Sequence, residues 1–168
     1  LVRSAPIFQK LGFATALVDA PSHYMTGDGL AGFRAAPLHA EDIGKVISDV
    51  RARTHAPVWV VGTSRGTISA ANVASRAQGD AAPDGVVLSS ALSVGSVARK
   101  SWVTQTLFDV PLENIRMPVL VIGHAEDTCL RSPASMMPKI LERMRGNRQQ
   151  AVTVTGGPGS RRSGGIDA

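Results

Sequence analysis

The five residues Gly62-Thr63-Ser64-Arg65-Gly66 carry the clearest chemical signal in the sequence, a serine with a glycine two positions away on each side. The apolar run Val58–Val61 precedes them, and a stretch typical of a helix, Thr67–Arg76, follows them. A serine on a tight turn between a strand and a helix presents its hydroxyl clear of the sheet, where it can act as a nucleophile. The pattern therefore predicts a nucleophilic Ser64 with strained backbone angles.

The same turn predicts roles for the residues beside Ser64. We expect side chains at Gly62 and Gly66 to collide with the neighbouring strand and helix. The backbone N–H of Arg65 and the start of the helix would point to where a tetrahedral oxyanion forms. Two other interpretations stay open. One is a phosphate-binding loop, although the glycines match neither the Walker nor the dinucleotide pattern, and the other is a purely structural turn.

A second motif, Gly123-His124-Ala125-Glu126-Asp127, follows the apolar run Pro118–Ile122. The order of strand, Gly62–Gly66, strand and then this second motif resembles the α/β-hydrolase fold, in particular its dienelactone-hydrolase-like and esterase-like members. The resemblance implies hydrolysis of an ester or related acyl bond through an acyl-enzyme. It also implies that Asp127 is the acidic member of a catalytic triad, with Glu126 as the alternative. A simple helix-capping role for Asp127 is the non-catalytic interpretation.

The triad histidine has no candidate at the position that the family implies. The family order is serine, acid, histidine, and no histidine follows Asp127 in this sequence. We therefore expect a piece of a hydrolase, with its first strands and its base outside these residues and with little turnover by itself. A catalytically inactive binding protein on the same fold is the alternative. We expect His23 to reach the substrate, and His39, His55 and His124 to lie at a helix start, in a loop and beside the acid loop.

Cys129 is the single cysteine of the sequence, so no disulfide can form within it. Relatives with an Asp-x-Cys acid loop sometimes tether that loop by a disulfide to the segment that bears the histidine. The resemblance thus implies a partner for Cys129 beyond Ala168. A small buried apolar residue is the alternative interpretation.

The composition excludes several classes of protein. Hydrophobic residues make up 43% and charged residues 18% of the chain, which indicates a globular protein rather than a disordered one. The net charge is +5, but the basic residues are scattered and do not alternate with aromatic residues, which argues against nucleic-acid binding. No apolar stretch approaches the ~20 residues that span a bilayer. We expect a small ester-like substrate and no metal or organic cofactor, while compartment and oligomeric state are not indicated.

Alternating apolar runs and helical stretches predict an α/β fold, a three-layer α/β/α sandwich around a mainly parallel sheet. One core is expected over residues 1–155, followed by a flexible Gly/Ser/Arg-rich tail over residues 156–168. Strands are expected at 13–18, 58–61, 85–90, 118–122 and 151–155, and helices at 2–11, 40–53, 67–76 and 133–145. A long glycine-bearing loop at 22–38 is expected to form one wall of an open site.

Overall fold

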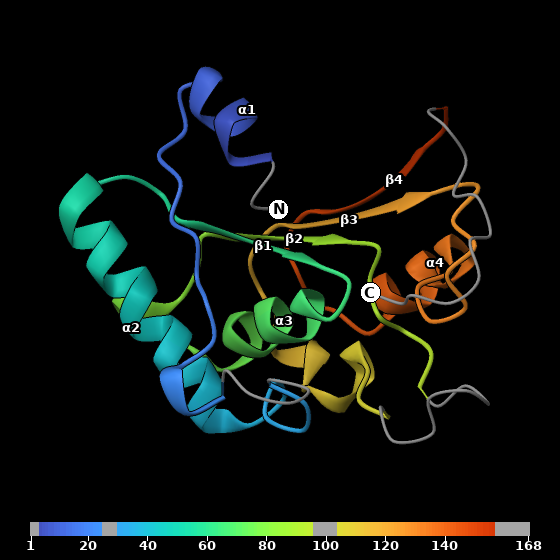
Figure 1. Ribbon diagram of the computed structural model, residues 1–168, viewed down its shortest axis with the longest axis horizontal. Helices are drawn as coiled ribbons and strands as arrows, with labels where there is room; N and C mark the ends of the chain where they lie inside the picture. The colour runs from blue at the N-terminus through green and yellow to red at the C-terminus, as the bar shows by residue number, and fades with distance from the viewer. Residues whose placement is uncertain (1–3, 25–29, 96–103, 157–168) are drawn as a thin grey trace.

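The computed structural model describes residues 4–24, 30–95 and 104–156, and four parallel strands form the sheet at its centre in the order β1-β2-β3-β4. All carboxyl ends of the strands therefore lie along one edge of the sheet, at the right of Figure 1. The register pairs Thr63 with Ser89 and Ser89 with Ile122, so the residues that follow these strands meet at that edge. The strands are β1 (Trp59–Thr63), β2 (Gly85–Ser89), β3 (Val119–His124) and β4 (Gln149–Val154).

Helices flank this sheet. Three of them, α2, α3 and α4, lie on one side of the sheet, and α1 lies on the other (Figure 1). The structure thus confirms the predicted α/β class with a parallel sheet and flanking helices. Within the described ranges, no helix is both long and apolar enough to cross a membrane. The helices are α1 (Ala5–Lys10), α2 (Pro37–Thr54), α3 (Gly66–Arg76) and α4 (Met137–Glu142), and short 3-10 turns occur at Ser22–Tyr24, Gly79–Ala81, Leu107–Asp109, Leu112–Asn114 and Ala134–Met136.

The main core lies between the sheet and α3. Every residue from Thr67 to Ser75 is buried, so α3 is enclosed on all sides for most of its length. Its Ile68 packs with Leu88 and Val121 of the sheet, and all three are almost completely buried. Burial of such a side chain stabilises the fold by about 1.5–3 kcal/mol. The helix that follows Ser64 is therefore fixed firmly against the sheet.

Two predicted elements differ from the structure. Residues 13–18 form no strand, and Phe13, Leu17 and Val18 are more than half exposed. Hydropathy identified a segment suited to burial, but among the described residues no strand donates to or accepts from its backbone. The segment instead runs from α1, on one side of the sheet, toward the start of α2 on the other (Figure 1). The predicted helix 133–145 is shorter, because only Met137–Glu142 is α-helical.

The predicted loop 22–38 is also shorter than expected, since α2 begins at Pro37. Residues 25–29 of that loop lie outside the described part of the chain. The same holds for the predicted tail except for its first residue, Gly156. The remaining predicted strands and helices are present, with ends that differ by a few residues.

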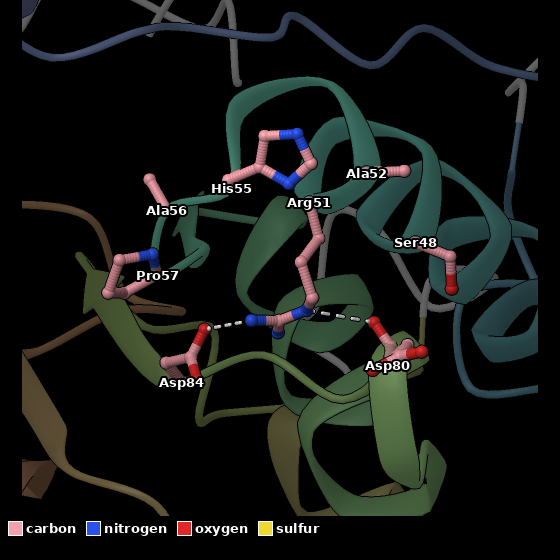
Figure 2. A pocket seen from close by; sticks show the side chains of 8 residues that line it. All are labelled: Ser48, Arg51, Ala52, His55, Ala56, Pro57, Asp80 and Asp84. Atoms are coloured by element: carbon pink, nitrogen blue, oxygen red, sulfur yellow. Dashed lines mark hydrogen bonds and ion pairs between the residues drawn. The ribbon is translucent and has the colours of Figure 1, made fainter.

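Arg51 lies near the amino ends of β1 and β2, and Figure 2 shows its guanidinium between Asp80 and Asp84. Its guanidinium donates to the Asp84 carboxylate at 2.7 Å, to the Ala82 carbonyl at 2.7 Å and to the Asp80 carbonyl at 3.2 Å. Partial burial raises the pKa of Asp84, but a hydrogen bond from the Val58 N–H and the Arg51 guanidinium outweigh it, so this pKa lies below its usual value. The ion pair thus joins α2 to the amino ends of β1 and β2.

A broad surface hollow of about 710 Å³ surrounds this ion pair. It lies at the amino ends of the strands, whereas parallel α/β sheets bind ligands at the carboxyl ends. The Arg51 guanidinium in this hollow is already bound to the Asp84 carboxylate and to the Asp80 and Ala82 carbonyls. We therefore assign the hollow a structural role and place the candidate site at the other edge. Its lining residues are Ser48, Arg51, Ala52, His55, Ala56, Pro57, Asp80 and Asp84.

Replacement Arg51→Met should lower the free energy of unfolding by about 1–2 kcal/mol, because the Asp84 carboxylate and the Asp80 and Ala82 carbonyls lose their donor. Arg53→Met is the matched control, since Arg53 makes an exposed pair with Asp49 on the same helix, and such pairs contribute about 0.3–0.5 kcal/mol. Urea denaturation with an unchanged m-value measures both. Equal losses for the two variants would contradict the role given to Arg51.

Candidate active site

Ser64 lies on the turn between β1 and α3 with a φ of +51°, a conformation that few non-glycine residues adopt. Its backbone N–H donates to the Ser89 carbonyl at 3.0 Å, which continues the pairing of β1 with β2. Its own carbonyl accepts from the Thr67 N–H at 3.0 Å, which begins the helix. The backbone strain that the sequence predicted at Ser64 is therefore present. Ser64 and Arg65 alone connect the end of β1 to the start of α3.

The two glycines of the motif differ in what they allow. A Cβ at Gly62 would lie 2.5 Å from the Gly66 carbonyl oxygen and 2.8 Å from the Thr67 Cα, so no side chain fits there. This confirms the prediction for Gly62. The same prediction is wrong for Gly66, because a Cβ there meets no described atom within 4 Å. The close approach of the strand to the helix takes place at the α-carbon of Gly62, and the Gly66 α-carbon faces open space.

Thr67 is a residue of the site that the sequence analysis missed. It is fully buried, and its hydroxyl donates to the Ser64 carbonyl at 2.6 Å. The hydroxyl oxygen of Thr67 also accepts from the Leu92 N–H at 3.2 Å. Thr67 thus fastens the turn at Ser64 to the loop that follows β2. The available signal was its position three residues after Ser64, since a threonine hydroxyl in a helix can reach a carbonyl three or four residues earlier.

The acid loop follows β3 at the same edge of the sheet. One oxygen of the Asp127 carboxylate accepts from the Cys129 N–H at 2.9 Å, and the other accepts from the Ser132 hydroxyl at 3.4 Å. Asp127 is half-buried, whereas Glu126 is exposed. Ser64 follows β1 and Asp127 follows β3, and β2 lies between these two strands. The axes of β1 and β3 are therefore about 10 Å apart, which is two strand spacings. A bridging group can lie between them.

His124 joins the acid loop to the segment after β4. Its Nδ1 lies 3.1 Å from the Glu126 backbone nitrogen, and its Nε2 lies 2.9 Å from the Gly156 carbonyl oxygen. Since a backbone N–H can only donate, Nδ1 accepts and the ring proton sits on Nε2, where it donates to Gly156. His124 therefore lines the acid loop, as expected. With both ring nitrogens engaged, it is not placed to accept a proton from Ser64.

His39 and His55 are placed elsewhere in the fold, and the structure does not test the expectation for His23. His39 is buried near the start of α2, with its Nε2 2.9 Å from the Ser69 hydroxyl. Burial and the nearby Arg34 guanidinium lower the pKa of His39, and Asp42 acts in the opposite direction. His55 ends α2 in a left-handed conformation at the opposite edge. His23 belongs to the turn Ser22–Tyr24, but its side chain lies outside the described part of the structure.

Cys129 is exposed and has a free thiol within the described residues. The alternative that it is a small buried apolar residue is therefore wrong, because its place in the acid loop leaves the side chain facing solvent. The disulfide implied by the resemblance stays a prediction. Across residues 4–24, 30–95 and 104–156, no group of three or more His, Cys, Asp and Glu side chains is arranged to hold a metal ion.

Comparison with known proteins relates the chain to others by structure. No family model matches the sequence, and no curated protein matches it. A puromycin hydrolase complexed with PGG matches with a TM-score of 0.54 and 16% identity, over 73% of this chain and 22% of that chain. A zinc-bound, cold-adapted esterase from an Arctic intertidal metagenomic library matches with a TM-score of 0.50 and 15% identity, over 77% and 58%.

A monoacylglycerol lipase from Paleococcus ferrophilus also matches, with a TM-score of 0.47 and 15% identity over 70% of this chain and 65% of that chain. The chain thus spans less than two thirds of the length of each of these three proteins. At such identities the likeness concerns the fold.

The two glycines provide a matched pair of substitutions. Gly62→Ala should lower the free energy of unfolding by about 3 kcal/mol, because the added methyl group forces β1 and α3 apart. Gly66→Ala should change it by less than about 0.5 kcal/mol, since the new methyl group meets no described atom. Chemical denaturation of both variants tests this difference. Equal stability of the two proteins would contradict the close approach at Gly62.

The lowered pKa of His39 predicts a pH dependence of stability. The folded state keeps His39 neutral, whereas the unfolded chain binds a proton as the pH falls below the ordinary value of 6.5. Stability from this group is therefore present above pH 6.5 and is lost as the pH falls toward the folded pKa. We expect the wild type to lose more stability than His39→Gln between about pH 7.5 and 5. Denaturation curves at both pH values measure the difference, and parallel losses would argue against a neutral His39.

Proposed function

The described residues have the fold of the α/β-hydrolases, and on this fold we propose a serine hydrolase that cleaves an ester or related acyl bond. The observation that carries the proposal is the strained conformation of Ser64 at the carboxyl edge of the sheet. A non-glycine residue in such a conformation costs about 1–3 kcal/mol. Glycine would make the same turn without that cost. Ser90 and His55 also have a positive φ, so the position of Ser64 on the turn between β1 and α3, where a nucleophilic serine is presented, is what supports a need for its hydroxyl.

In the proposed reaction, the Ser64 hydroxyl oxygen attacks the substrate carbonyl carbon and a histidine base takes the hydroxyl proton. The tetrahedral intermediate collapses, the base returns the proton to the departing alcohol, and an acyl-enzyme forms. Water then releases the acid by the same steps. The Arg65 N–H and the start of α3 donate to the oxyanion, and one such donor contributes about 3 kcal/mol to transition-state stabilisation.

Asp127 is proposed to orient the base. Its carboxylate is held by the Cys129 N–H and the Ser132 hydroxyl. His124 ties the same loop to Gly156, directly after β4. This arrangement supports a base in the segment that follows β4, where the serine–acid–histidine order of the family would put it. We assign the base to a histidine outside the printed sequence, because no histidine follows Asp127 within it.

A second candidate function is a catalytically inactive binding protein on the α/β-hydrolase fold. The fold by itself does not distinguish the two functions. Reactivity of Ser64 distinguishes them, because a binding protein does not need an activated serine hydroxyl.

Labelling of the full-length protein with a fluorophosphonate probe tests the proposal. We expect one adduct, on the peptide that contains Ser64, and its loss in Ser64→Ala. Ser90→Ala is the matched control, because Ser90 follows the neighbouring strand and also has a positive φ, +46°. Asp127→Asn should slow ester hydrolysis by about 10⁴-fold through loss of base orientation. A folded full-length protein that stays unlabelled would overturn the hydrolase proposal.

A further inference from the structure

The loop that follows β2 (residues 90–95) is hydrogen-bonded both to the first turn of α3 and to the acid loop. Thr67 and Arg131 make these bonds. We propose that both are positioning residues, which set the separation of the Ser64 hydroxyl and the Asp127 carboxylate. Both roles rest on the proposed hydrolase function.

The pairing of the strands does not by itself fix this separation. The Ser64 N–H donates to the Ser89 carbonyl at 3.0 Å, so the start of the nucleophile turn continues the pairing of the sheet. Asp127 lies on the turn after β3, where its N–H donates to the His124 carbonyl at 3.1 Å. The position of its carboxylate therefore depends on the contacts of the acid loop. A displacement of about 1 Å in an active site can slow a reaction about 10²-fold, so these contacts bear directly on the rate.

Thr67 holds the loop after β2 to the nucleophile turn. Its hydroxyl donates its one proton to the Ser64 carbonyl at 2.6 Å, and its oxygen accepts from the Leu92 N–H at 3.2 Å. The two bonds strengthen each other, because a hydroxyl that donates becomes a better acceptor. Thr67 is fully buried and Leu92 is 2% exposed, so solvent water does not replace either bond. The position of Leu92 is therefore coupled to that of the Ser64 carbonyl.

Arg131 holds the same loop to the acid loop, through its backbone and its side chain. Its carbonyl accepts from the Ser93 N–H at 2.9 Å and from the Val94 N–H at 3.0 Å. Its guanidinium donates to the Val94 and Gly95 carbonyls, both at 3.2 Å, and to the Gln105 carbonyl at 3.0 Å. Arg131 is only 8% exposed, and a planar guanidinium holds several acceptors at once, unlike the point charge of a lysine. The two loops are thus bound to each other at several points.

Arg131 is joined to Asp127 through its neighbour Ser132. Ser132 is buried, and its hydroxyl donates to one oxygen of the Asp127 carboxylate at 3.4 Å. The other oxygen accepts from the Cys129 N–H at 2.9 Å. The Ser132 N–H donates to the Cys129 carbonyl at 3.3 Å, which closes the acid loop. The turn at Ser64 and the Asp127 carboxylate are therefore connected through the loop after β2.

Thr67→Val in the full-length protein tests the first half of this connection, because it keeps the size of the side chain and removes the hydroxyl. We expect kcat for p-nitrophenyl acetate to fall by about ten- to hundredfold, since Ser64 loses its fixed orientation. KM should change by less than about twofold, because the substrate contacts are unaltered. Thr67→Ser keeps the hydroxyl and should retain most of kcat.

Ser75→Ala is the matched control for stability. Ser75 is also buried in α3, and its hydroxyl donates to the carbonyl three residues earlier, that of Asn72, at 2.9 Å. Thr67→Val and Ser75→Ala should both lower the urea midpoint, and only Thr67→Val should lower kcat, measured at a temperature at which both variants are folded. An unchanged kcat in Thr67→Val, or equal losses of kcat in both variants, would overturn the positioning role.

Arg131→Lys tests the second half of the connection. It keeps the positive charge, but one ammonium group does not hold three carbonyls in the same geometry. We expect kcat to fall by about tenfold with little change in KM, and this variant carries the test if Thr67→Val does not fold. In the double variant the loss should be smaller than the product of the single losses, because both residues act through the same loop. An unchanged kcat in Arg131→Lys, or losses that multiply fully, would contradict the shared connection.

The two proposals fail in different ways. A wild type that hydrolyses the ester and is labelled at Ser64, with a kcat that is insensitive to Thr67→Val and Arg131→Lys, would retain the hydrolase and remove the positioning roles. A folded full-length wild type that neither hydrolyses the ester nor is labelled would overturn both proposals.

Discussion

The contact between Gly62 and the first turn of α3 is the constraint on which the rest of the site depends. With 2.5 Å between a Cβ at this position and the Gly66 carbonyl oxygen, only a glycine lets the strand pass so close to the helix. That closeness forces the chain to reverse within two residues, which leaves Ser64 in its strained conformation. It also places α3 directly behind the turn, buried from Thr67 to Ser75. The free energy gained by burying α3 from Thr67 to Ser75 thus offsets the conformational cost at Ser64.

The buried polar residues of α3 transmit this fixed position to the surrounding loops. A buried hydroxyl or amide costs free energy unless it is hydrogen-bonded, and Thr67, Ser69 and Asn72 each have at least one partner outside the helix. Arg131 does the same from the acid loop, donating to the Val94 and Gly95 carbonyls at 3.2 Å and to the Gln105 carbonyl at 3.0 Å. The loops at the carboxyl ends of the strands are therefore held in position by side chains of α3 and of the acid loop.

The sequence predicted those features that depend on neighbours along the chain. The strand before Ser64, the helix after it and the need for Gly62 all follow from local pattern. Residues 13–18 were wrongly predicted, because hydropathy reports what a segment could bury and not whether a strand lies beside it. Thr67 was missed for a related reason. Its spacing from Ser64 was visible in the sequence, but its contact with the Leu92 N–H joins segments that are far apart in the chain.

Hydrogen bonds hold the two ends of the parallel sheet in different ways. At the amino ends of β1 and β2, the Arg51 guanidinium pairs with the Asp84 carboxylate, which joins α2 to the sheet. At the carboxyl ends, the Thr67 hydroxyl donates to the Ser64 carbonyl, and the acid loop supplies two donors to the Asp127 carboxylate. The turn and the acid loop are thus each fixed by their own contacts, so a base between them would meet groups that are already in position.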